Sequence, residues 1–563
     1  MAQHPDKPWL AEYQAGVPAE IDAGRYASIV DVLEQSCRQF GDRAAYENYG
    51  FALSYDDVDR LSQDFASYLQ NVCGLHRGDR VALMMPNLLQ YPVALFGVLR
   101  AGLVAVNVNP LYTPRELEHQ LRDSGAKAIV LIESCCATLQ QVVARTPLEA
   151  VITTQPADLF PLLRSVAMNA LFKYVRKMVP AWQIEGAVPF RTALARGKAQ
   201  PYSRTALTHE DVAFLQYTGG TTGLSKGATL THGNVVANLV QMRTWSPILQ
   251  DGQEIIITAL PLYHIFALTV NCLLFMSIGG RNVLITNPRD IPAFCRELQR
   301  YQFTSFTGVN TLFNGLLNTP SFKEIDFSKL KFVIGGGAAV QQAVAEKWRQ
   351  VTGTALTEGY GLSETSPGVC FGPLDKPDWN GTIGVPLPST LVSIRNDDNR
   401  ALPLGEAGEL CVKGPQVMRG YWEKPEENRK AFTPDGYFRT GDVATMDAKG
   451  YFRIVDRKKD MILVSGFNVY PNEIEAVVAM HPGVLECACI GVPDEKSGEA
   501  VKVVVVKKDP ALTEAALREF CKQNLTGYKV PRIIEFRKEI PKSNVGKILR
   551  RELRTPEKEA AAA

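Results

Sequence analysis

The sequence has little that would mark a disulfide-bonded, zinc-binding or secreted protein. Its eleven cysteines are odd in number and scattered, and no C-x-x-C pair occurs among them. This usage argues against a disulfide framework or a zinc site and predicts reduced thiols in a cytoplasmic protein. Residues 1–8 lack a basic segment followed by an apolar run, so we expect no secretory signal.

A large charge of one sign is also absent. The 563 residues include 61 Lys and Arg against 59 Asp and Glu, which leaves a net charge of +2. A chain this close to neutrality is not a general polyanion binder, so we expect no nucleic-acid partner. Its length is too great for one hydrophobic core and favours about three or four domain-sized units.

One apolar run, residues 255–278, contains no charged residue and is long enough to cross a bilayer on length alone. A proline, a histidine and an asparagine interrupt it, and two glycines follow it. We therefore interpret the run as a strand over 255–259 followed by a buried helix from about Phe266. A transmembrane helix is the less favoured alternative.

Strand and helix patterns alternate along most of the chain, from residue 80 to 132 and again after Asp211. This alternation predicts an α/β fold with parallel-rich sheets covered by helices. Short strands and turns over about 390–455 predict a small β-subdomain. We expect a large N-terminal domain over 1–459 and a small, mobile α+β C-terminal domain over 460–563, with a hinge near Lys459.

The stretch with the clearest chemical character is residues 217–228, placed between a predicted buried strand and a predicted helix. It holds four glycines, four serine or threonine residues and one lysine. Glycines let the backbone approach an anion closely, and successive N–H groups then form an anion-binding concavity. We interpret it as a polyphosphate-binding loop, with a flexible glycine hairpin as the alternative. The candidate residues are Thr218, Gly219, Gly220, Thr221, Thr222, Gly223 and Lys226.

This loop is not a standard P-loop, because no glycine in it is followed at the required spacing by Gly-Lys-Ser or Gly-Lys-Thr. Lys226 is followed by Gly227, so no hydroxyl lies beside the lysine for a magnesium ion. The loop resembles the phosphate-binding signature of adenylate-forming enzymes. That superfamily includes acyl-CoA synthetases, luciferases and the adenylation domains of peptide synthetases.

Further segments look like the other core motifs of that superfamily and occur in the same order. Taken singly, each could be an ordinary loop or a solvated surface segment, but their joint occurrence makes the resemblance specific over about residues 28–553. Within the superfamily, the chain is most similar to bacterial long-chain fatty-acid–CoA ligases. Residues 454–471 of this chain resemble the signature of those ligases. The matching segments are 260–264, 335–339, 360–365, 436–442, 454–471 and 541–547.

The resemblance implies ATP, Mg²⁺ and coenzyme A as ligands, and a role for each matched residue. The 217–228 loop would hold the ATP phosphates, and Thr218 with Glu364 would hold Mg²⁺. Lys547 would bridge the carboxylate and the α-phosphate, with His264 beside the reacting carboxylate. The ribose and a phosphate would be bound by Asp442 and Arg457. The adenine and acyl adenylate would be bordered by Gly337, Ala338, Tyr360, Gly361 and Thr365. The loop expected to exchange places with Lys547 for thioester formation is Ser465, Gly466 and Phe467.

The implied activity is the ATP-dependent conversion of a long-chain fatty acid to acyl-AMP, followed by transfer of the acyl group to coenzyme A. Attack of a carboxylate on a phosphate brings two anions together, so cations must stabilise it. Only sixteen residues follow Lys547, so we expect a separate thiol molecule rather than a fused carrier domain. A tryptophan gate described for some long-chain members would be Leu268 here, which argues against that particular gate.

Three other functions remain open at this point. The first is a medium-chain or aryl acid CoA ligase, and the second is an adenylating oxygenase of the luciferase type. The third is a fatty-acid-binding protein without catalysis, which the joint presence of Lys547, Asp442 and Glu364 disfavours.

Residues 159–184 contain no acidic residue but include Arg164, Lys173, Arg176 and Lys177. Apolar residues in this segment fall roughly on one helical face, which is typical of a helix that lies in a membrane interface. The plainer alternative is a surface helix packed on its own domain. Peripheral contact with the inner face of the cell membrane and a homodimer are both compatible with the sequence.

Overall fold

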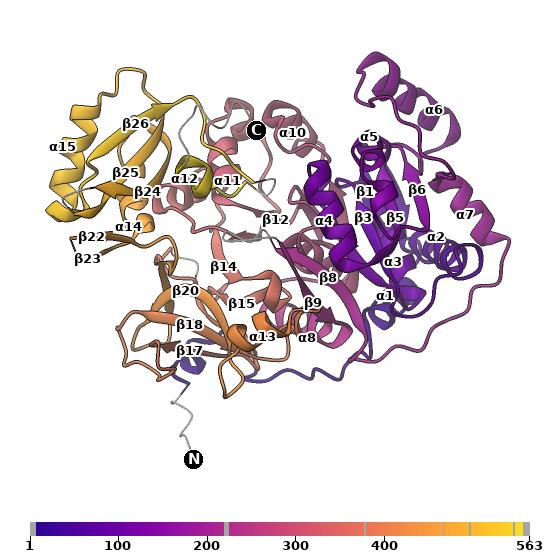
Figure 1. Ribbon diagram of the computed structural model, residues 1–563, viewed down its shortest axis with the longest axis horizontal. Coiled ribbons are helices and arrows are strands. Elements are labelled where there is room, and N and C mark those ends of the chain that lie inside the picture. Colours follow the sequence, from indigo (N-terminus) through magenta and orange to yellow (C-terminus); the bar gives the residue numbers. More distant parts are fainter. Residues whose placement is uncertain are drawn as a thin grey trace.

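The computed structural model describes residues 7–218, 225–376, 379–465, 467–494, 497–543 and 546–554. Two large sheets and the helices that cover them form most of the chain. A four-stranded sheet and a separate small domain follow toward the C-terminus, the latter in yellow in Figure 1.

The first large sheet has nine strands, and five of its neighbouring pairs run parallel. In spatial order the strands are β16 (Val385–Pro386), β15 (Gly368–Phe371), β14 (Thr357–Gly361), β13 (Phe332–Gly336), β12 (Ser305–Gly308), β10 (Ile255–Thr258), β11 (Arg281–Leu284), β1 (Ala44–Asn48) and β2 (Phe51–Ser54). An aromatic-rich core that includes Phe306, Phe313 and Trp348 joins this sheet to its covering helices. These helices are α10 (Ile291–Leu298), α11 (Asn310–Leu317) and α12 (Gln342–Thr352).

The second large sheet has eight strands and is parallel from β8 to β7. In spatial order they are β19 (Gly420–Tyr421), β9 (Lys226–Thr231), β8 (Val212–Thr218), β4 (Val104–Asn107), β3 (Arg80–Met84), β5 (Ala126–Ile132), β6 (Ala150–Thr154) and β7 (Val188–Pro189). The other helices of the large domain are α1 (Ile29–Phe40), α2 (Tyr55–Ser67), α3 (Gln90–Arg100), α4 (Pro114–Ser124), α5 (Cys136–Gln140), α6 (Leu162–Ala170), α7 (Phe190–Lys198), α8 (His232–Trp245), α9 (Phe275–Ser277) and α13 (Pro425–Ala431).

Antiparallel strands make up the β-subdomain and most of the small domain. The β-subdomain sheet comprises β17 (Leu391–Arg395), β18 (Gly408–Lys413), β20 (Phe438–Met446) and β21 (Phe452–Arg457). The small domain contains β22 (Ile462–Val464), β23 (Phe467–Val469), β24 (Val484–Asp494), β25 (Gly498–Lys507), β26 (Ile533–Arg537), α14 (Pro471–Ala479), α15 (Glu514–Asn524) and α16 (Arg550–Arg554). Its apolar core is separate from that of the large sheets. The predicted fold class is confirmed, while the boundary at Lys459, in the turn between β21 and β22, stays a prediction.

The apolar run over 255–278 folds as the sequence pattern indicated. It forms β10, a π-helical segment over Ala267–Leu274 and the short helix α9. Every residue of the π-helical segment is buried within the domain. Within the described ranges, no helix combines the length and the apolar character that crossing a bilayer requires.

The predicted surroundings of the glycine-rich segment were partly wrong. Lys226–Thr231 forms β9, which pairs antiparallel with β8, so the segment connects two strands rather than a strand and a helix. The opposite edge of β9 pairs with β19, a strand about 190 positions later in the chain, and this long-range pairing leaves no local signal. Helix α8 then begins at His232, where Thr231 and Asn234 form a capping box.

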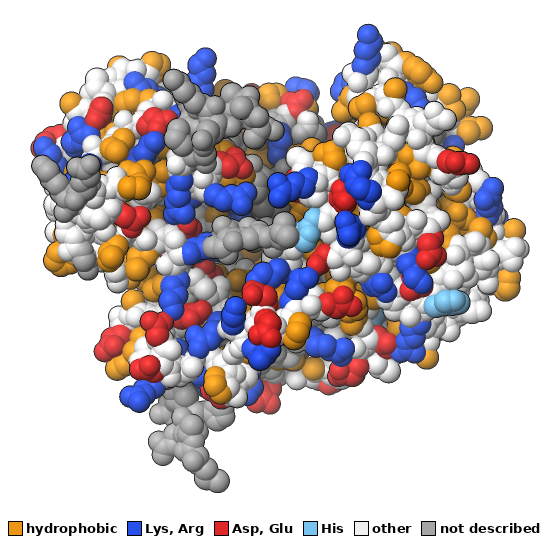
Figure 2. Space-filling view, viewed as in Figure 1, with side chains coloured by type: hydrophobic (Ala, Val, Ile, Leu, Met, Phe, Trp, Pro, Cys, Tyr) orange, Lys and Arg blue, Asp and Glu red, His pale blue; other side chains and the backbone are white. Residues whose placement is uncertain are grey.

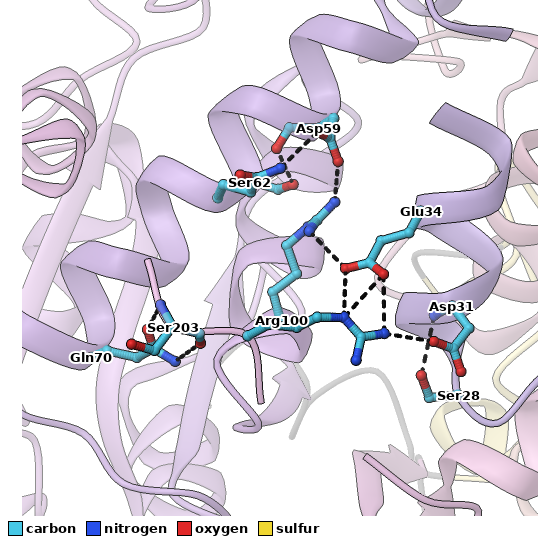
Figure 3. A network of polar contacts seen from close by, with 10 residues as sticks. Ser28, Asp31, Glu34, Asp59, Ser62, Gln70, Arg100 and Ser203 are labelled. Atoms are coloured by element: carbon cyan, nitrogen blue, oxygen red, sulfur yellow. Dashed lines mark hydrogen bonds and ion pairs between the residues drawn. The ribbon is translucent and has the colours of Figure 1, made fainter. Parts of the chain in front are cut away.

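Helix α3 is buried along its whole length, and its last residue, Arg100, therefore requires partners inside the protein. Figure 3 shows its guanidinium between Glu34 of α1 and Asp59 of α2. Arg204, in the segment before β8, binds the other side of Glu34 and also reaches Asp31. This ionic network joins α1, α2 and α3 to the segment that leads into β8.

We expect Arg100→Ala to destabilise the large domain, because it removes the buried cation that Asp59 and Glu34 share, although Arg204 still binds Glu34. Breaking a buried ion pair from one side lowers the free energy of unfolding by about 3 kcal/mol. Urea unfolding followed by fluorescence measures the change. The control is Arg60→Ala, which breaks an exposed pair with Asp57 of the same helix and costs less than about 1 kcal/mol. If the two variants lost the same free energy of unfolding, burial of the Arg100 ion pairs would not be the cause of the effect.

Candidate active site

A small cavity lies beside the ends of β13 and β14, where the large and small domains meet. Its volume is about 60 Å³, which is room for a few water molecules. Its lining includes His264, Phe266, Gly337, Tyr360, Gly361 and Lys547. Five of the predicted site residues are therefore brought together, although they come from sequence positions nearly 300 apart.

Lys547 enters this cavity from the small domain. A Cβ atom placed on Gly337 would lie 3.0 Å from the Lys547 Cε, and Gly337 has a φ of +77°, so glycine both adopts the turn and leaves room for the lysine. Burial, with repulsion from Arg457, lowers the pKa of the Lys547 ammonium to about 8. Asp442 and Glu364 attract the ammonium and oppose this shift. An anionic ligand in the cavity would restore the full charge of Lys547.

Asp442 is held by partners from two neighbouring elements. The Tyr360 hydroxyl donates to its Oδ2 at 2.6 Å, and the Arg457 Nε lies 3.1 Å from its Oδ1. The pairing of β20 with β21 places Asp442 directly opposite Arg457. Attraction by Asp442 raises the pKa of Arg457 further. The carboxylate is thus fixed in orientation beside the cavity, as a residue that binds vicinal hydroxyls must be.

His264 is a neutral histidine in this site. Burial, with repulsion from Lys547, lowers the pKa of its imidazole to about 3. Its Nδ1 accepts a hydrogen bond from the Phe266 N–H at 3.3 Å, so the single proton resides on Nε2. His264 can therefore donate a hydrogen bond to a ligand but does not contribute a charge.

Glu364 is buried, and its Oε1 accepts a hydrogen bond at 2.8 Å from the hydroxyl of Tyr421 in β19. Burial raises the pKa of this carboxyl group, while the bond from Tyr421 lowers it. In the described part of the chain, no Lys or Arg forms an ion pair with Glu364. A buried carboxylate that lacks a cationic partner could hold a hard divalent cation through oxygen, as expected for a metal shared with a phosphate ligand.

Lys226 contacts the ring of Tyr421, whose hydroxyl binds Glu364. Its Nζ is 5.2 Å from the centre of the Tyr421 ring and forms an ion pair with Glu427 of α13. Thr218 stands opposite Lys226 in the β8–β9 ladder, at the base of the glycine-rich segment. The predicted phosphate-binding residues Gly219, Gly220, Thr221, Thr222 and Gly223 lie outside the described residues.

The remaining predicted residues lie away from the cavity or at its edge. Ala338 is exposed beside Gly337, whereas Thr365 is fully buried and its hydroxyl bonds to the backbone of its own turn. Ser465 and Phe467 are exposed on the β22–β23 turn of the small domain, and Phe467 stacks on Tyr528 with ring centres 4.9 Å apart. Gly466 lies outside the described residues. Leu268, at the position of the expected gate, is fully buried in the π-helical segment.

Sequence reasoning missed two residues that orient this site, Tyr421 and Glu427. Tyr421 reaches Glu364 because β19 pairs with β9, with Tyr421 opposite Ala228. Neither residue stands in a pattern that indicates its role, and their positions follow from pairing across about 190 positions. The role of a tyrosine in a two-residue strand can be recognised only from the pairing of that strand in the folded sheet.

Comparisons with known proteins agree with this geometry. The model of the AMP-binding enzyme family matches residues 33–422, and that of the AMP-binding enzyme C-terminal domain matches residues 473–547. The chain therefore belongs to the AMP-binding enzyme family.

Relatives that cover nearly the whole chain carry the name long-chain-fatty-acid–CoA ligase. The protein of Escherichia coli O6:H1 is 57% identical over 549 residues, which are 97% of this chain and 98% of the relative. The protein of Yersinia pestis is 56% identical and covers 98% of both chains. A more distant one from Bacillus subtilis is 36% identical, again with 98% of both chains covered. These findings confirm the resemblance that the motifs indicated.

Solved structures show the same architecture. The anthranilate CoA ligase AuaEII in complex with anthranoyl-AMP superposes with a TM-score of 0.85 at 24% identity, over 96% of this chain and 100% of that protein. ATP-bound MatB from Rhodopseudomonas palustris superposes with a TM-score of 0.78 at 28% identity, over 93% and 98% of the two chains.

Proposed function

We propose that this protein converts a long-chain fatty acid and ATP to acyl-AMP and pyrophosphate, and then transfers the acyl group to coenzyme A. The observation that carries the proposal is the insertion of Lys547 into the cavity beside Gly337, His264 and Tyr360. The long-chain acid rests on the relatives named above. The cavity has room for the carboxylate end of an acid, so a long chain requires surrounding apolar side chains such as Phe266 to move apart.

In the first step, a carboxylate oxygen attacks the α-phosphorus of ATP, and the bond from that phosphorus to the pyrophosphate oxygen breaks. Both reactants are anions, so the barrier depends on positive charge that is already in place. Lys547 supplies it at the carboxylate and the α-phosphate, and the neutral His264 can donate from Nε2 to an acyl oxygen. Asp442, held by Tyr360 and Arg457, orients the ribose so that the α-phosphorus faces the acid.

In the second step, the sulfur of coenzyme A loses its proton and attacks the acyl carbonyl, and the carbon–oxygen bond to AMP breaks. Lys547 lines the cavity in this structure, whereas Phe467 is exposed on the small domain. A rotation of the small domain about the turn near Lys459 exchanges Lys547 for the Ser465–Phe467 loop. The thiol then reaches a carbonyl that was closed to it.

Magnesium fits the donor set at Glu364, with Thr218 as the second expected ligand. When bound, the ion would neutralise charge on the phosphates of ATP. The Tyr421 hydroxyl orients the Glu364 carboxylate by hydrogen bonding to it, and this bond opposes the rise in the pKa of Glu364 that burial causes.

We expect Tyr421→Phe to weaken the binding of ATP in the presence of Mg²⁺ by on the order of tenfold, because a hydrogen bond to a charged group is lost. Calorimetric titration of ATP with and without Mg²⁺ measures the effect. The control is Tyr528→Phe in the small domain, which should leave both affinities unchanged. If Tyr421→Phe weakened the binding of ATP equally with and without Mg²⁺, the tyrosine would support the fold of the site rather than the metal ligand.

We expect Lys547→Ala to slow acyl-AMP formation by about 10²- to 10³-fold, since it removes one oriented charge from the reacting groups. Thioester formation from supplied acyl-AMP should stay close to that of the unchanged protein. Single-turnover assays with palmitate, octanoate and benzoate measure each step and also separate long-chain from medium-chain and aryl activity. Lys522→Ala, which breaks an exposed pair with Glu519 on the same domain, is the control. Equal loss of both steps would refute the assigned role, and a preference for benzoate would refute the long-chain assignment.

We also propose that residues 162–178 contact the surface of an anionic membrane. Helix α6 and the π-helical turn Leu171–Val175 project from the large domain in Figure 1, and Figure 2 shows hydrophobic side chains and a few basic ones over this projection. Leu163 and Val175 are 86% and 71% exposed. The exposed apolar residues of the segment are Leu162, Leu163, Val166, Leu171, Tyr174, Val175 and Met178.

The basic residues of this segment do not all face solvent. Lys173 forms an ion pair with buried Glu133 at 2.5 Å, and Trp182 donates to the same carboxylate, so Lys173 anchors the projection to the domain. Arg164, Arg176 and Lys177 are exposed beside the apolar residues. Apolar side chains flanked by exposed cations, with no acidic residue in the segment, complement a lipid surface of negative charge.

We expect the combined change Leu163→Asp and Val175→Asp to abolish flotation with vesicles of phosphatidylglycerol and phosphatidylethanolamine. Arg164→Glu with Arg176→Glu should have the same effect at physiological salt. Leu404→Asp, at an apolar residue of the β-subdomain that is 54% exposed, is the control and should still float. Unchanged flotation of both variants would refute the proposal. If sedimentation velocity instead showed a dimer that the two Asp substitutions dissociate, this face would be assigned to contact with a second copy of the chain.

A further inference from the structure

Asp456 is a fully buried carboxylate at the boundary between the two domains, with an exposure of 0%. It belongs to β21, where the backbone pairs with β20 and places Asp456 opposite Val443, so it is part of the β-subdomain. Its side chain, however, has partners in the small domain. The turn 458–460, which contains the predicted hinge, lies between Asp456 and those partners in sequence.

The first partner is the N-terminus of helix α14. The Asn472 N–H donates to the Asp456 Oδ2 at 2.9 Å, and the Arg457 N–H donates to Oδ1 at 2.7 Å. The residue before α14, Tyr470, makes no side-chain cap for this helix. Asp456 therefore supplies, from the large domain, the hydrogen-bond acceptor that a helix N-terminus otherwise takes from its own cap residue. Its negative charge also suits the positive end of the helix dipole.

The second partner is Arg550 of α16. One Nη atom of its guanidinium lies 3.6 Å from the Asp456 Oδ1, and the other donates to the Asn472 Oδ1 at 2.6 Å. Arg550 also binds Glu475 of α14, at 2.9 Å, and lies 3.6 Å from Asp460. Arg550 thus joins Asp456 to α14. It is three residues after Lys547, so the element that meets Asp456 is continuous with the segment that carries the lysine into the cavity.

Apart from Lys547 and the turn itself, the other side-chain hydrogen bonds that the described residues form across this boundary join uncharged groups. The Thr311 hydroxyl donates to the Gly546 carbonyl at 3.0 Å, and the Asn314 side chain donates to the Leu485 carbonyl at 2.9 Å, both from helix α11. These bonds involve partly buried groups that water can satisfy after separation. A buried carboxylate that loses both a helix N-terminus and a guanidinium is much harder to satisfy.

We propose that Asp456 is a positioning residue that clamps the small domain in the orientation in which Lys547 reaches the cavity. This proposal rests on the proposed two-step function. The contacts of Asp456 stabilise the domain orientation for acyl-AMP formation relative to the orientation for thioester formation. A rotation about the turn 458–460 carries Asn472 and Arg550 away and leaves Asp456 behind in the β-subdomain. The two steps therefore depend on Asp456 in opposite directions.

The test compares Asp456→Asn with the unchanged protein in each half-reaction. Asparagine keeps an acceptor oxygen for Asn472 but loses the charge that faces Arg550 and the helix N-terminus. We expect acyl-AMP formation to slow about tenfold and thioester formation from supplied acyl-AMP to be equal or faster. If the two steps changed by the same factor, or if neither changed, Asp456 would not be a clamp. If the unchanged protein carried out neither step, the proposed function itself would be wrong.

A second readout follows the orientation of the domains without any turnover. Arg457, Lys458 and Lys459 are trypsin sites at the boundary turn, so limited proteolysis reports how often that turn opens. We expect Asp456→Asn and Asp456→Ala to be cut there several-fold faster than the unchanged protein. Unaltered cleavage in both variants would refute the clamp. This would hold even if acyl-AMP formation were slower in these variants, because the slower rate would then have another cause.

The matched control is Asp435→Asn, which makes the same chemical change in the same subdomain. Asp435 forms a two-pronged pair with Arg395, and both residues lie on one side of the boundary. We expect it to leave both half-reactions and the cleavage at 457–459 unchanged. If Asp435→Asn changed the half-reactions and the cleavage at 457–459 as much as Asp456→Asn does, any weakened ion pair of the subdomain would have the same effect. That result would refute a specific role for Asp456.

Discussion

Lys547 carries a positive charge into a cavity whose other lining residues are uncharged: glycines, aromatic and aliphatic side chains, a serine and a neutral histidine. Burial disfavours that charge, and the lowered pKa of about 8 reflects it. The charge is retained because Asp442 and Glu364 lie near enough to attract it, while Gly337 leaves space for the side chain. The rest of the architecture is arranged around this balance. It brings a lysine from near the C-terminus to the ends of two strands of a large sheet, and the proposed second step requires that lysine to leave again.

The scaffold on each side of the cavity is rigid for different reasons. In the large domain, parallel strands and helices buried on all sides place Tyr360, Gly337 and His264, and the network around Arg100 joins the helices to the segment before β8 (Figure 3). In the β-subdomain, strand pairing alone sets Asp442 opposite Arg457. The small domain has its own core and meets the others through few polar contacts, so its placement can change without unfolding either partner.

Sequence patterns predicted a large part of this arrangement. Alternating apolar runs were sufficient for the two parallel-rich sheets, because the faces of such strands are covered and their periodicity is local. The motifs also led to His264, Gly337, Tyr360 and Lys547, which the structure brings to one cavity. Tyr421 and Glu427 could not be predicted in the same way. Their roles depend on an edge strand of two residues that joins the sheet across about 190 positions. The error about β9 has the same origin, because its second neighbour is supplied by that distant strand.

The ion pair between Lys226 and Glu427 has a consequence for selectivity among anions. The positive charge of Lys226 is already neutralised, so an incoming anion does not fill a vacant site but displaces a carboxylate. The net electrostatic gain is the difference between two attractions and is small for a species with a single weak charge. A ligand that offers several charges at once, and that reaches other donors at the same time, overcomes this competition. For the proposed role of Lys226 in phosphate binding, competition from Glu427 would favour a polyanionic chain of phosphates over solitary small anions.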